Sequence, residues 1–182
     1  MFSPIECGPI NIRSFREEDL SAFATYRAIP EVARYQSWTT YTYEDALSLY
    51  HNMQTHPFGT PGEWFQLAIV DASTDQLIGD LAVHFIDEQQ VEVGFTMSPT
   101  AQGKGYATRA LSHFVERLFT NMKKHRIIAT VDALNTPAYT LLERVGFRRE
   151  AHFIENIFFK GAWGSEYQYA LLSSEWKEKH VG

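Results

Sequence analysis

The stretch "VGFTMSPTAQGKGYATRALSHFVERL", residues 93–118, decides the fold of this chain. Its first part alternates like a β-strand and stops before Pro99, and a short loop containing Gly103 and Gly105 follows. After the loop, apolar residues recur at spacings of three and four, as on one face of an amphipathic helix: Ala107, Ala110, Leu111, Phe114, Val115 and Leu118. The stretch predicts a strand that leads through a tight glycine turn directly into a helix.

The composition is that of a soluble globular chain. Of the 182 residues, 45% are hydrophobic and 21% are charged, and there is no run of about 18 apolar residues that could span a membrane. The single cysteine, Cys7, excludes an internal disulfide, and the seven histidines show no metal-ligand spacing. The net charge of −6, without a long Lys/Arg run, argues against nucleic acid as a partner. We expect residues 1–182 to form one cytoplasmic domain without a metal.

The remaining sequence predicts an α/β chain in which helices and strands are mixed. A strand over residues 9–15 is followed by helices over 16–29 and 42–53, the second with Thr42 as its N-cap. Three strands over 63–70, 76–86 and 90–97 are joined by short turns and predict an antiparallel meander. Beyond the opening stretch, we expect a strand over 126–133, a helix that starts near Pro137 and stops at Gly146, and strands over 147–159 and 166–172.

Three kinds of phosphate-binding loop are possible interpretations of "AQGKGYAT", residues 101–108. A P-loop requires Ser or Thr after its Gly-Lys pair, which this loop lacks, and a dinucleotide fingerprint would need glycine where Thr108 stands. The third is a pyrophosphate cradle, in which unpaired N–H groups of the turn and of the helix N-terminus converge on an anion. On the glycines alone, a turn with nothing bound is at least as good an explanation.

Four motifs in register resemble the GNAT superfamily of acyl-CoA N-acyltransferases. Gln102, Gly105 and Ala107 match its Q/R-x-x-G-x-G/A motif, and Met97 and Pro99 precede them at the family's V-x-P spacing. Residues 135–147, "NTPAYTLLERVGF", resemble its Asn-led helix that ends in Gly-Phe. The tail over residues 158–176 resembles the subgroup of ribosomal-protein N-terminal alanine acetyltransferases.

The resemblance implies the GNAT fold and acetyl-CoA as cosubstrate. The fold is one mixed, mostly antiparallel sheet of about seven strands, splayed in the centre and flanked by about four helices. The strand over 91–97 would part from the strand over 126–133, and Gly94 is consistent with a β-bulge at that point. Pantetheine would pair with the open strand edge, and the pyrophosphate would lie on the glycine turn. The implied cofactor-binding residues are Phe95, Thr96, Met97, Gln102, Gly103, Lys104, Gly105, Tyr106, Ala107, Thr108 and Asn135, the last placed just before a Thr136 N-cap with its amide free.

Attack of an amine on a thioester needs a group that removes a proton, because a free amine is mostly protonated at neutral pH. Glu92 matches the strand glutamate that is the general base in some GNAT members, although an ordinary exposed glutamate is the alternative. Asp80 and His84, on the neighbouring strand, are substitutes for this role. The N–H of Met97 would stabilise the oxyanion.

The sequence departs from the family at the general acid. Leu142 stands where many members have a tyrosine, and Ala138 stands where the resembling subgroup often has a serine. Tyr139 is the neighbouring hydroxyl, but it follows Ala138 and is expected to face elsewhere. Since a thiolate leaves easily, we expect the reaction to proceed without an acid.

The acceptor is expected to contact the aromatic segment before the second helix. This segment, which includes Arg34 and Tyr35, would form one wall of the substrate cleft. We assign substrate contacts to Trp38, Tyr41 and His84. A core position is an equal alternative for Trp38. The predicted function is acetyl transfer to a primary amine, either a protein N-terminus or a small molecule. The alternative is a catalytically silent acyl-CoA-binding module. A monomer and a homodimer are both compatible with the sequence.

Overall fold

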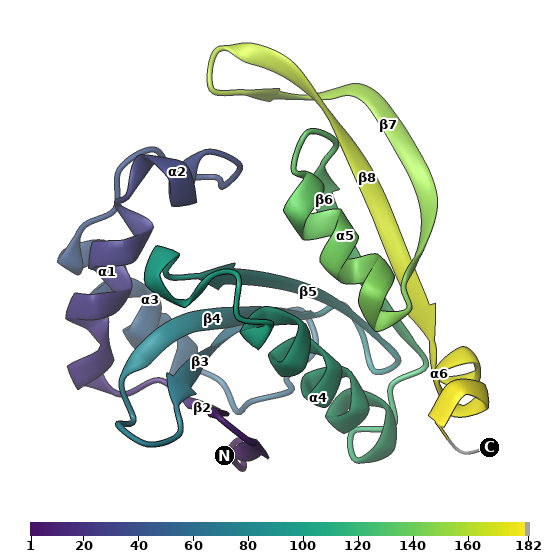
Figure 1. The fold of residues 1–182 in the computed structure, drawn as a ribbon, viewed down its shortest axis with the longest axis horizontal. Helices are drawn as coiled ribbons and strands as arrows, with labels where there is room; N and C mark the ends of the chain where they lie inside the picture. Colours follow the sequence, from purple (N-terminus) through teal and green to yellow (C-terminus); the bar gives the residue numbers. More distant parts are fainter. Residues whose placement is uncertain (181–182) are drawn as a thin grey trace.

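The computed structural model describes residues 1–180, in which an eight-stranded mixed sheet carries helices on both faces (Figure 1). The strand order is β1-β2-β3-β4-β5-β6-β8-β7, and all neighbours are antiparallel except β5 and β6. The strands are β1 (Ile5–Cys7), β2 (Ile10–Ser14), β3 (Trp64–Asp71), β4 (Leu77–Phe85), β5 (Gln90–Met97), β6 (Arg126–Asp132), β7 (Arg148–Phe159) and β8 (Ala162–Leu172). The helices are α1 (Leu20–Arg27), α2 (Pro30–Ala33), α3 (Tyr43–Met53), α4 (Tyr106–Thr120), α5 (Thr136–Val145) and α6 (Ser173–His180), with 3-10 turns η1 (Glu17–Asp19) and η2 (Pro99–Ala101).

This architecture confirms the predicted fold and adds three short elements to it. Strand β1 pairs with β2 through a turn at Gly8, and its three residues are too few to show an alternating pattern in the sequence. Helix α2 has four residues and starts at Pro30, which suits a first helical position. Helix α6 follows β8 directly. Thr42 caps α3 as predicted, accepting a hydrogen bond from the Asp45 N–H.

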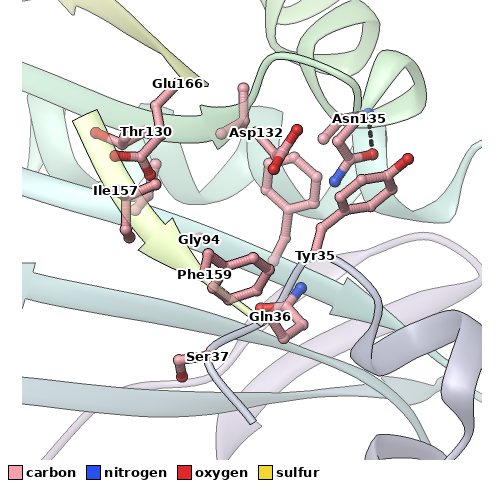
Figure 2. Close-up of a pocket in the computed structure, with 14 residues that line it drawn as sticks. Tyr35, Gln36, Ser37, Gly94, Thr130, Asp132, Asn135, Ile157, Phe159 and Glu166 are labelled. Carbon is pink, nitrogen blue, oxygen red and sulfur yellow. Dashed lines mark hydrogen bonds between the residues drawn. The ribbon is translucent and has the colours of Figure 1, made fainter. Parts of the chain in front are cut away.

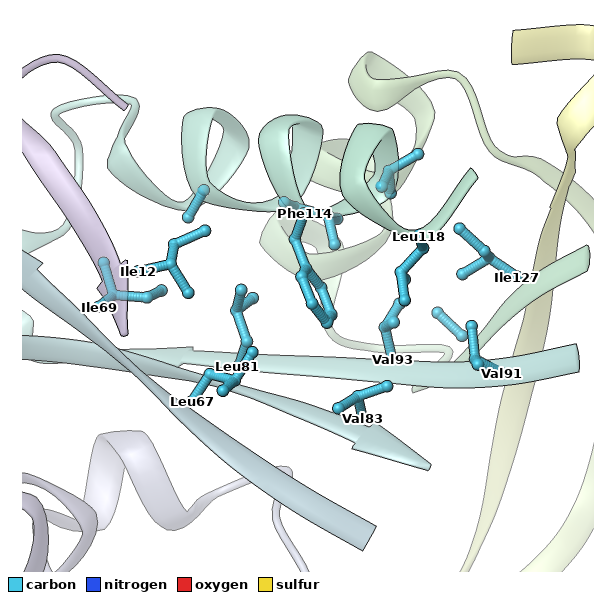
Figure 3. Packing of buried hydrophobic residues seen from close by; sticks show 14 of the residues in the cluster. Ile12, Leu67, Ile69, Leu81, Val83, Val91, Val93, Phe114, Leu118 and Ile127 are labelled. Atoms are coloured by element: carbon cyan, nitrogen blue, oxygen red, sulfur yellow. The ribbon is translucent and has the colours of Figure 1, made fainter. Parts of the chain in front are cut away.

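Two apolar clusters hold the helices to opposite faces of the sheet. Phe114 and Leu118 of α4 point into the larger cluster, which they share with Leu81 of β4 and Val93 of β5 (Figure 3). The smaller cluster joins α1 and α3 to the other face of β3, through residues such as Phe23, Ala46, Ala68 and Val70. Alternate residues of β3 are therefore buried on opposite faces, as strand geometry requires.

The sheet opens between β5 and β6. These parallel strands pair only where residues 90–92 meet residues 126–128. Beyond that point, β5 stays paired with β4 as far as Met97, while β6 follows β8 as far as Asp132. The β-bulge predicted at Gly94 is wrong for the β4–β5 ladder, since Gly94 pairs there in regular register with Ala82. The opening arises at the other edge of β5, where β6 leaves with β8.

Residues 1–180 include no helix that is both long and apolar enough to cross a membrane. The same residues include no cluster of three or more His, Cys, Asp or Glu side chains that could hold a metal ion. Cys7 is buried, and this burial raises the pKa of its thiol to about 11.

Candidate active site

A groove of about 930 Å³ follows the opening of the sheet. Its floor is the end of β5, one end is the loop that leads into α4, and α5 forms a wall. The lining includes most of the predicted cofactor residues: Phe95, Thr96, Met97, Gln102, Gly103, Gly105, Tyr106, Ala107, Thr108 and Asn135. Lys104 does not line the groove; its ammonium lies 5.9 Å from the centre of the Tyr106 ring.

The open edge of β5 presents unpaired backbone groups to this groove. In an antiparallel ladder, the backbone of alternate residues faces the partner strand or faces away from it. The Ser98 N–H donates to the Ile78 carbonyl of the β4 side, so Phe95 and Met97 direct their N–H and C=O groups away from β4. The Gln102 amide donates to the Met97 carbonyl across 3.2 Å, which ties the glycine loop to the strand end.

The glycines of the loop are required by its backbone conformation. Gly103 and Gly105 have φ angles of 74° and 77°, in the left-handed region that L side chains rarely adopt. Gly105 is the residue before α4, and the N–H groups of residues 103–108 donate to no other group in the described part of the chain. A Cβ on either glycine would meet no atom within 4 Å. The turn therefore leaves open space beside several unpaired donors at a helix N-terminus, where an anion is favoured.

Two arginines also line the groove: Arg144, which the sequence did not single out, and Arg34, which was expected in the wall of the acceptor site. Arg144 comes from α5 and Arg34 from the residue after α2, and both side chains are exposed. They belong to elements far apart in the chain, and Arg144 is an unremarkable surface arginine in the sequence. Their charges suit an anionic ligand in this groove.

Asn135 lies at the start of α5 and contacts both this groove and a second cavity. It is itself the N-cap of α5, and its side-chain oxygen accepts from the Ala138 N–H across 3.4 Å. The prediction that Thr136 is the N-cap is therefore wrong, because Thr136 and Pro137 already belong to the helix. The carboxamide oxygen of Asn135 is engaged, and its NH₂ group is the part left for a ligand.

The second cavity has a volume of about 250 Å³ and adjoins the groove at Tyr35, Gln36, Phe95, Asn135 and Ala138, which line both. Figure 2 shows its lining, which comes from the segment after α2, from β5, from β6 and from the β7–β8 hairpin. The acidic residues of this lining are Asp132 and Glu166, which are paired across β6 and β8. No Lys, Arg or His contributes to it, and neither carboxylate has an ion-pair partner within residues 1–180.

Glu92 lies on β5, two residues before Gly94, which lines this cavity. Burial raises the pKa of its carboxyl above the ordinary value; the charge of His84 acts in the opposite direction, and that of Glu166 raises it further. One carboxylate oxygen is 3.9 Å from Nδ1 of His84, and the Glu92 side chain is 28% exposed. Glu92 itself lines neither cavity, but the next residues of β5 line the second one. A half-buried carboxyl with a raised pKa has the properties of a general base.

Asp80, considered as a substitute base, is enclosed by other side chains. It is 1% exposed and accepts hydrogen bonds from Tyr26, from Arg27 at 3.0 Å and from Gln66 at 2.8 Å. These partners occupy its oxygens, so it does not reach an acceptor. His84 instead stacks on Trp64, with ring centres 4.7 Å apart.

Trp38 and Tyr41 line neither cavity. The Trp38 indole donates to the Arg27 carbonyl at 2.8 Å, and the Arg27 guanidinium lies 4.1 Å from the centre of the indole ring. Tyr41 packs edge-on against both Trp38 and Phe23. The neighbouring residues of the same segment, residues 35–37, line the second cavity in their place.

Comparison with known proteins gives the family. Residues 10–148 match the model of the acetyltransferase (GNAT) domain. The chain belongs to the GNAT acetyltransferase family. An uncharacterized N-acetyltransferase of Bacillus subtilis, YnaD, is 34% identical over 91% of this chain and 94% of its own length. A spermidine N(1)-acetyltransferase of Vibrio cholerae is 27% identical over 59% of this chain and 64% of its own length.

Solved structures show the same fold. A GNAT acetyltransferase from Bacillus anthracis superposes with a TM-score of 0.84 at 29% identity, covering 94% of this chain and 99% of that one. The Vibrio cholerae spermidine N-acetyltransferase in complex with CoA and spermine has a TM-score of 0.81 at 22% identity, covering 92% and 98%. This GNAT chain is therefore an N-acetyltransferase enzyme.

The positions that hold a general acid in other GNAT proteins carry no hydroxyl here. Leu142 is fully buried in the core, and Ala138 lies at the junction of the two cavities. Tyr139 packs against Tyr167 and lines neither cavity, and its hydroxyl is 3.1 Å from the Thr136 hydroxyl. The Tyr139 ring therefore lies outside both linings, and its hydroxyl contacts Thr136 at the edge of the groove.

Proposed function

We propose that this enzyme binds acetyl-CoA in the larger groove and transfers the acetyl group to a primary amine of a small cationic molecule. The observation that carries the acceptor class is the 250 Å³ cavity, whose lining within residues 1–180 holds two carboxylates without an ion pair and no cation. Each carboxylate accepts one hydrogen bond, Asp132 from the Leu134 N–H and Glu166 from the Asn156 amide. Carboxylates without an ion pair attract a positively charged ligand, and the aromatic rings of Tyr35 and Phe159 offer further contact to a cation. The cavity lies below the range of about 300–1,000 Å³ typical of sites for drug-sized ligands, which favours a small acceptor.

The groove has the features needed to hold acetyl-CoA. The unpaired N–H groups of residues 103–108 would bind the pyrophosphate, and the open backbone at Phe95 and Met97 would pair with the pantetheine amides. Arg34 and Arg144 would contribute charge to phosphate binding. The thioester would then lie where the two cavities meet, between Phe95 and Ala138.

In this arrangement the reaction is a direct displacement. The amine nitrogen forms a bond to the thioester carbon, the carbon–sulfur bond breaks, and coenzyme A leaves as a thiolate. Glu92 takes the proton that the amine nitrogen loses, directly or through a water molecule. A backbone N–H at the open edge of β5 stabilises the oxyanion. No side chain of α5 is required to protonate the sulfur, because a thiol of pKa about 8.5 is a good leaving group.

Two sequence relatives support a small amine. They are the spermidine N(1)-acetyltransferases of Vibrio cholerae and Escherichia coli. In this chain, Asp132 and Glu166 would hold a second, non-reacting ammonium group of the acceptor. Glu92 would receive the proton from the reacting amine.

The experiment is to measure thiol release from acetyl-CoA with a panel of a diamine, a polyamine, a monoamine and a peptide with a free N-terminus. We expect turnover with the diamine and the polyamine to exceed that with the other two. Turnover with the peptide alone would contradict the small-amine assignment. Binding of acetyl-CoA with no release for any amine would support the silent module instead.

A further inference from the structure

The tip of the β7–β8 hairpin is tied to the segment after α2 by one side chain. Lys160 donates from its ammonium to the carbonyl of Ala33 and, at 2.8 Å, to the carbonyl of Trp38. These carbonyls lie more than a hundred residues away in the sequence. They flank residues 35–37, which line the second cavity, called the acceptor cavity below because the proposed function places the amine there. Figure 1 shows the hairpin extending past α5 toward α2.

The turn that carries Lys160 is not one that favours lysine. Phe159 pairs with Ala162, so Lys160 and Gly161 are the two residues of the hairpin loop, with φ angles of 50° and 84°. Both angles are those of a type I′ turn, in which Asn or Asp is preferred before the glycine. Lysine is therefore a poor choice for the turn itself, and the two hydrogen bonds of its ammonium give a reason for its presence.

The tie joins two segments that both line the acceptor cavity. Tyr35, Gln36 and Ser37 line the cavity from the segment between Ala33 and Trp38, whose carbonyls Lys160 holds. Ile157 and Phe159 line it from the hairpin, immediately before Lys160. A second bond, from the Tyr35 hydroxyl to the Leu134 carbonyl at 3.3 Å, joins the same segment to the loop before α5.

We propose that Lys160 is a specificity-determining residue that keeps the acceptor cavity short and so selects small amines over peptide N-termini. An acceptor longer than the cavity must pass between the hairpin and the α2 segment, where the Lys160 ammonium bridges the two walls. This inference rests on the proposed function, and it explains how a GNAT enzyme whose tail resembles that of protein N-terminal acetyltransferases would exclude a peptide.

The experiment compares Lys160→Asn with Lys160→Arg. Asparagine suits the turn at least as well as lysine but cannot reach either carbonyl, so a change in Lys160→Asn reports the lost tie rather than a damaged turn. Arginine retains a cation of similar length. The measured quantity is the ratio of kcat/KM for a diamine to kcat/KM for an Ala-initiated tetrapeptide, together with hydrogen exchange of the amides over residues 33–38.

We expect Lys160→Asn to lower this ratio roughly tenfold, as the loss of two charge-assisted hydrogen bonds allows the walls to part, and to raise exchange over residues 33–38. Lys160→Arg should keep the ratio within a few fold of the wild type, and neither variant should change acetyl-CoA affinity. An unchanged ratio in Lys160→Asn, with the wild type active on the diamine, would overturn the inference alone. No activity of the wild type on any amine would overturn the proposed function as well.

Discussion

At the scale of single residues, Glu92 is the general base of the proposed mechanism. Its carboxyl is half-buried, and both this burial and the nearby Glu166 raise its pKa, while His84 opposes them. The raised pKa makes the carboxylate a stronger base than a solvated glutamate. The base is active only when ionised, so catalysis must fall as the pH drops through this pKa.

We predict that Glu92→Gln lowers kcat roughly a hundredfold or more, the usual effect of removing a general base, while acetyl-CoA affinity is unchanged. The acidic limb that Glu92 contributes to the pH profile of kcat should disappear in this variant. Stopped-flow thiol detection and calorimetry measure the two quantities. A rise confined to the amine KM would show instead that Glu92 orients the acceptor.

Tyr139 is the residue with which the proposal of a reaction without a general acid can be tested. Its ring packs on Tyr167 and lines neither cavity, and its hydroxyl contacts Thr136 of the groove lining. We predict that Tyr139→Phe keeps turnover within a few fold and that kcat/KM of the wild type, after its rise, stays level to about pH 9. A descending limb near neutral pH that is lost in Tyr139→Phe would identify this tyrosine as the acid.

At the scale of elements, the glycine turn before α4 combines a left-handed backbone conformation with open space beside its unpaired N–H groups. We predict that Gly105→Val weakens acetyl-CoA binding at least tenfold, because the side chain would occupy the space beside the unpaired N–H groups. Gly62→Val is the matched control, since Gly62 also has a positive φ, of 87°, and open space around its Cα, but it does not line the groove. Each substitution should cost about 1–2 kcal/mol of stability through its backbone conformation. Equal acetyl-CoA affinities of the two variants would contradict the cradle.

Strands β6 and β7 and helix α6 are joined by an ionic network around Glu150. Arg126 and Arg148 hold the pKa of the Glu150 carboxyl down at about 2, and Arg148 also pairs with Glu175. A depressed pKa contributes stability that is present above pH 4.5, the ordinary value, and is lost as the pH falls toward 2.

We therefore predict that Glu150→Gln lowers the free energy of unfolding by about 1 kcal/mol at pH 7 and flattens its dependence on pH between these values, since solvent screens partly exposed pairs. Chemical denaturation at several pH values measures both effects. Glu88→Gln, which changes an exposed glutamate without an ion pair in residues 1–180, is the control. The same pH dependence in both variants would contradict the role of the network.

At the scale of the whole molecule, features encoded in short stretches could be predicted from the sequence, and features made by distant segments could not. The glycine turn, the cap at Thr42 and the three-strand meander depend on neighbouring residues, and all are present. The pairing of Asp132 with Glu166 depends on the register of β6 against β8, which no local pattern contains. The burial of Asp80 could not be predicted for the same reason, because side chains from α1 and β3 enclose it.

The proposed function depends most on the carboxylates of Asp132 and Glu166, which are expected to bind the second, non-reacting ammonium group of a diamine. The most direct measurement is kcat/KM for 1,4-diaminobutane relative to butylamine, in the wild type and in the double variant Asp132→Asn, Glu166→Gln. We predict that the wild type prefers the diamine roughly tenfold or more, as expected for one well-placed charge contact, and that the double variant loses this preference chiefly through a higher KM for the diamine. Equal values of kcat/KM for the two amines in the wild type, or a preference that survives in the double variant, would contradict the account.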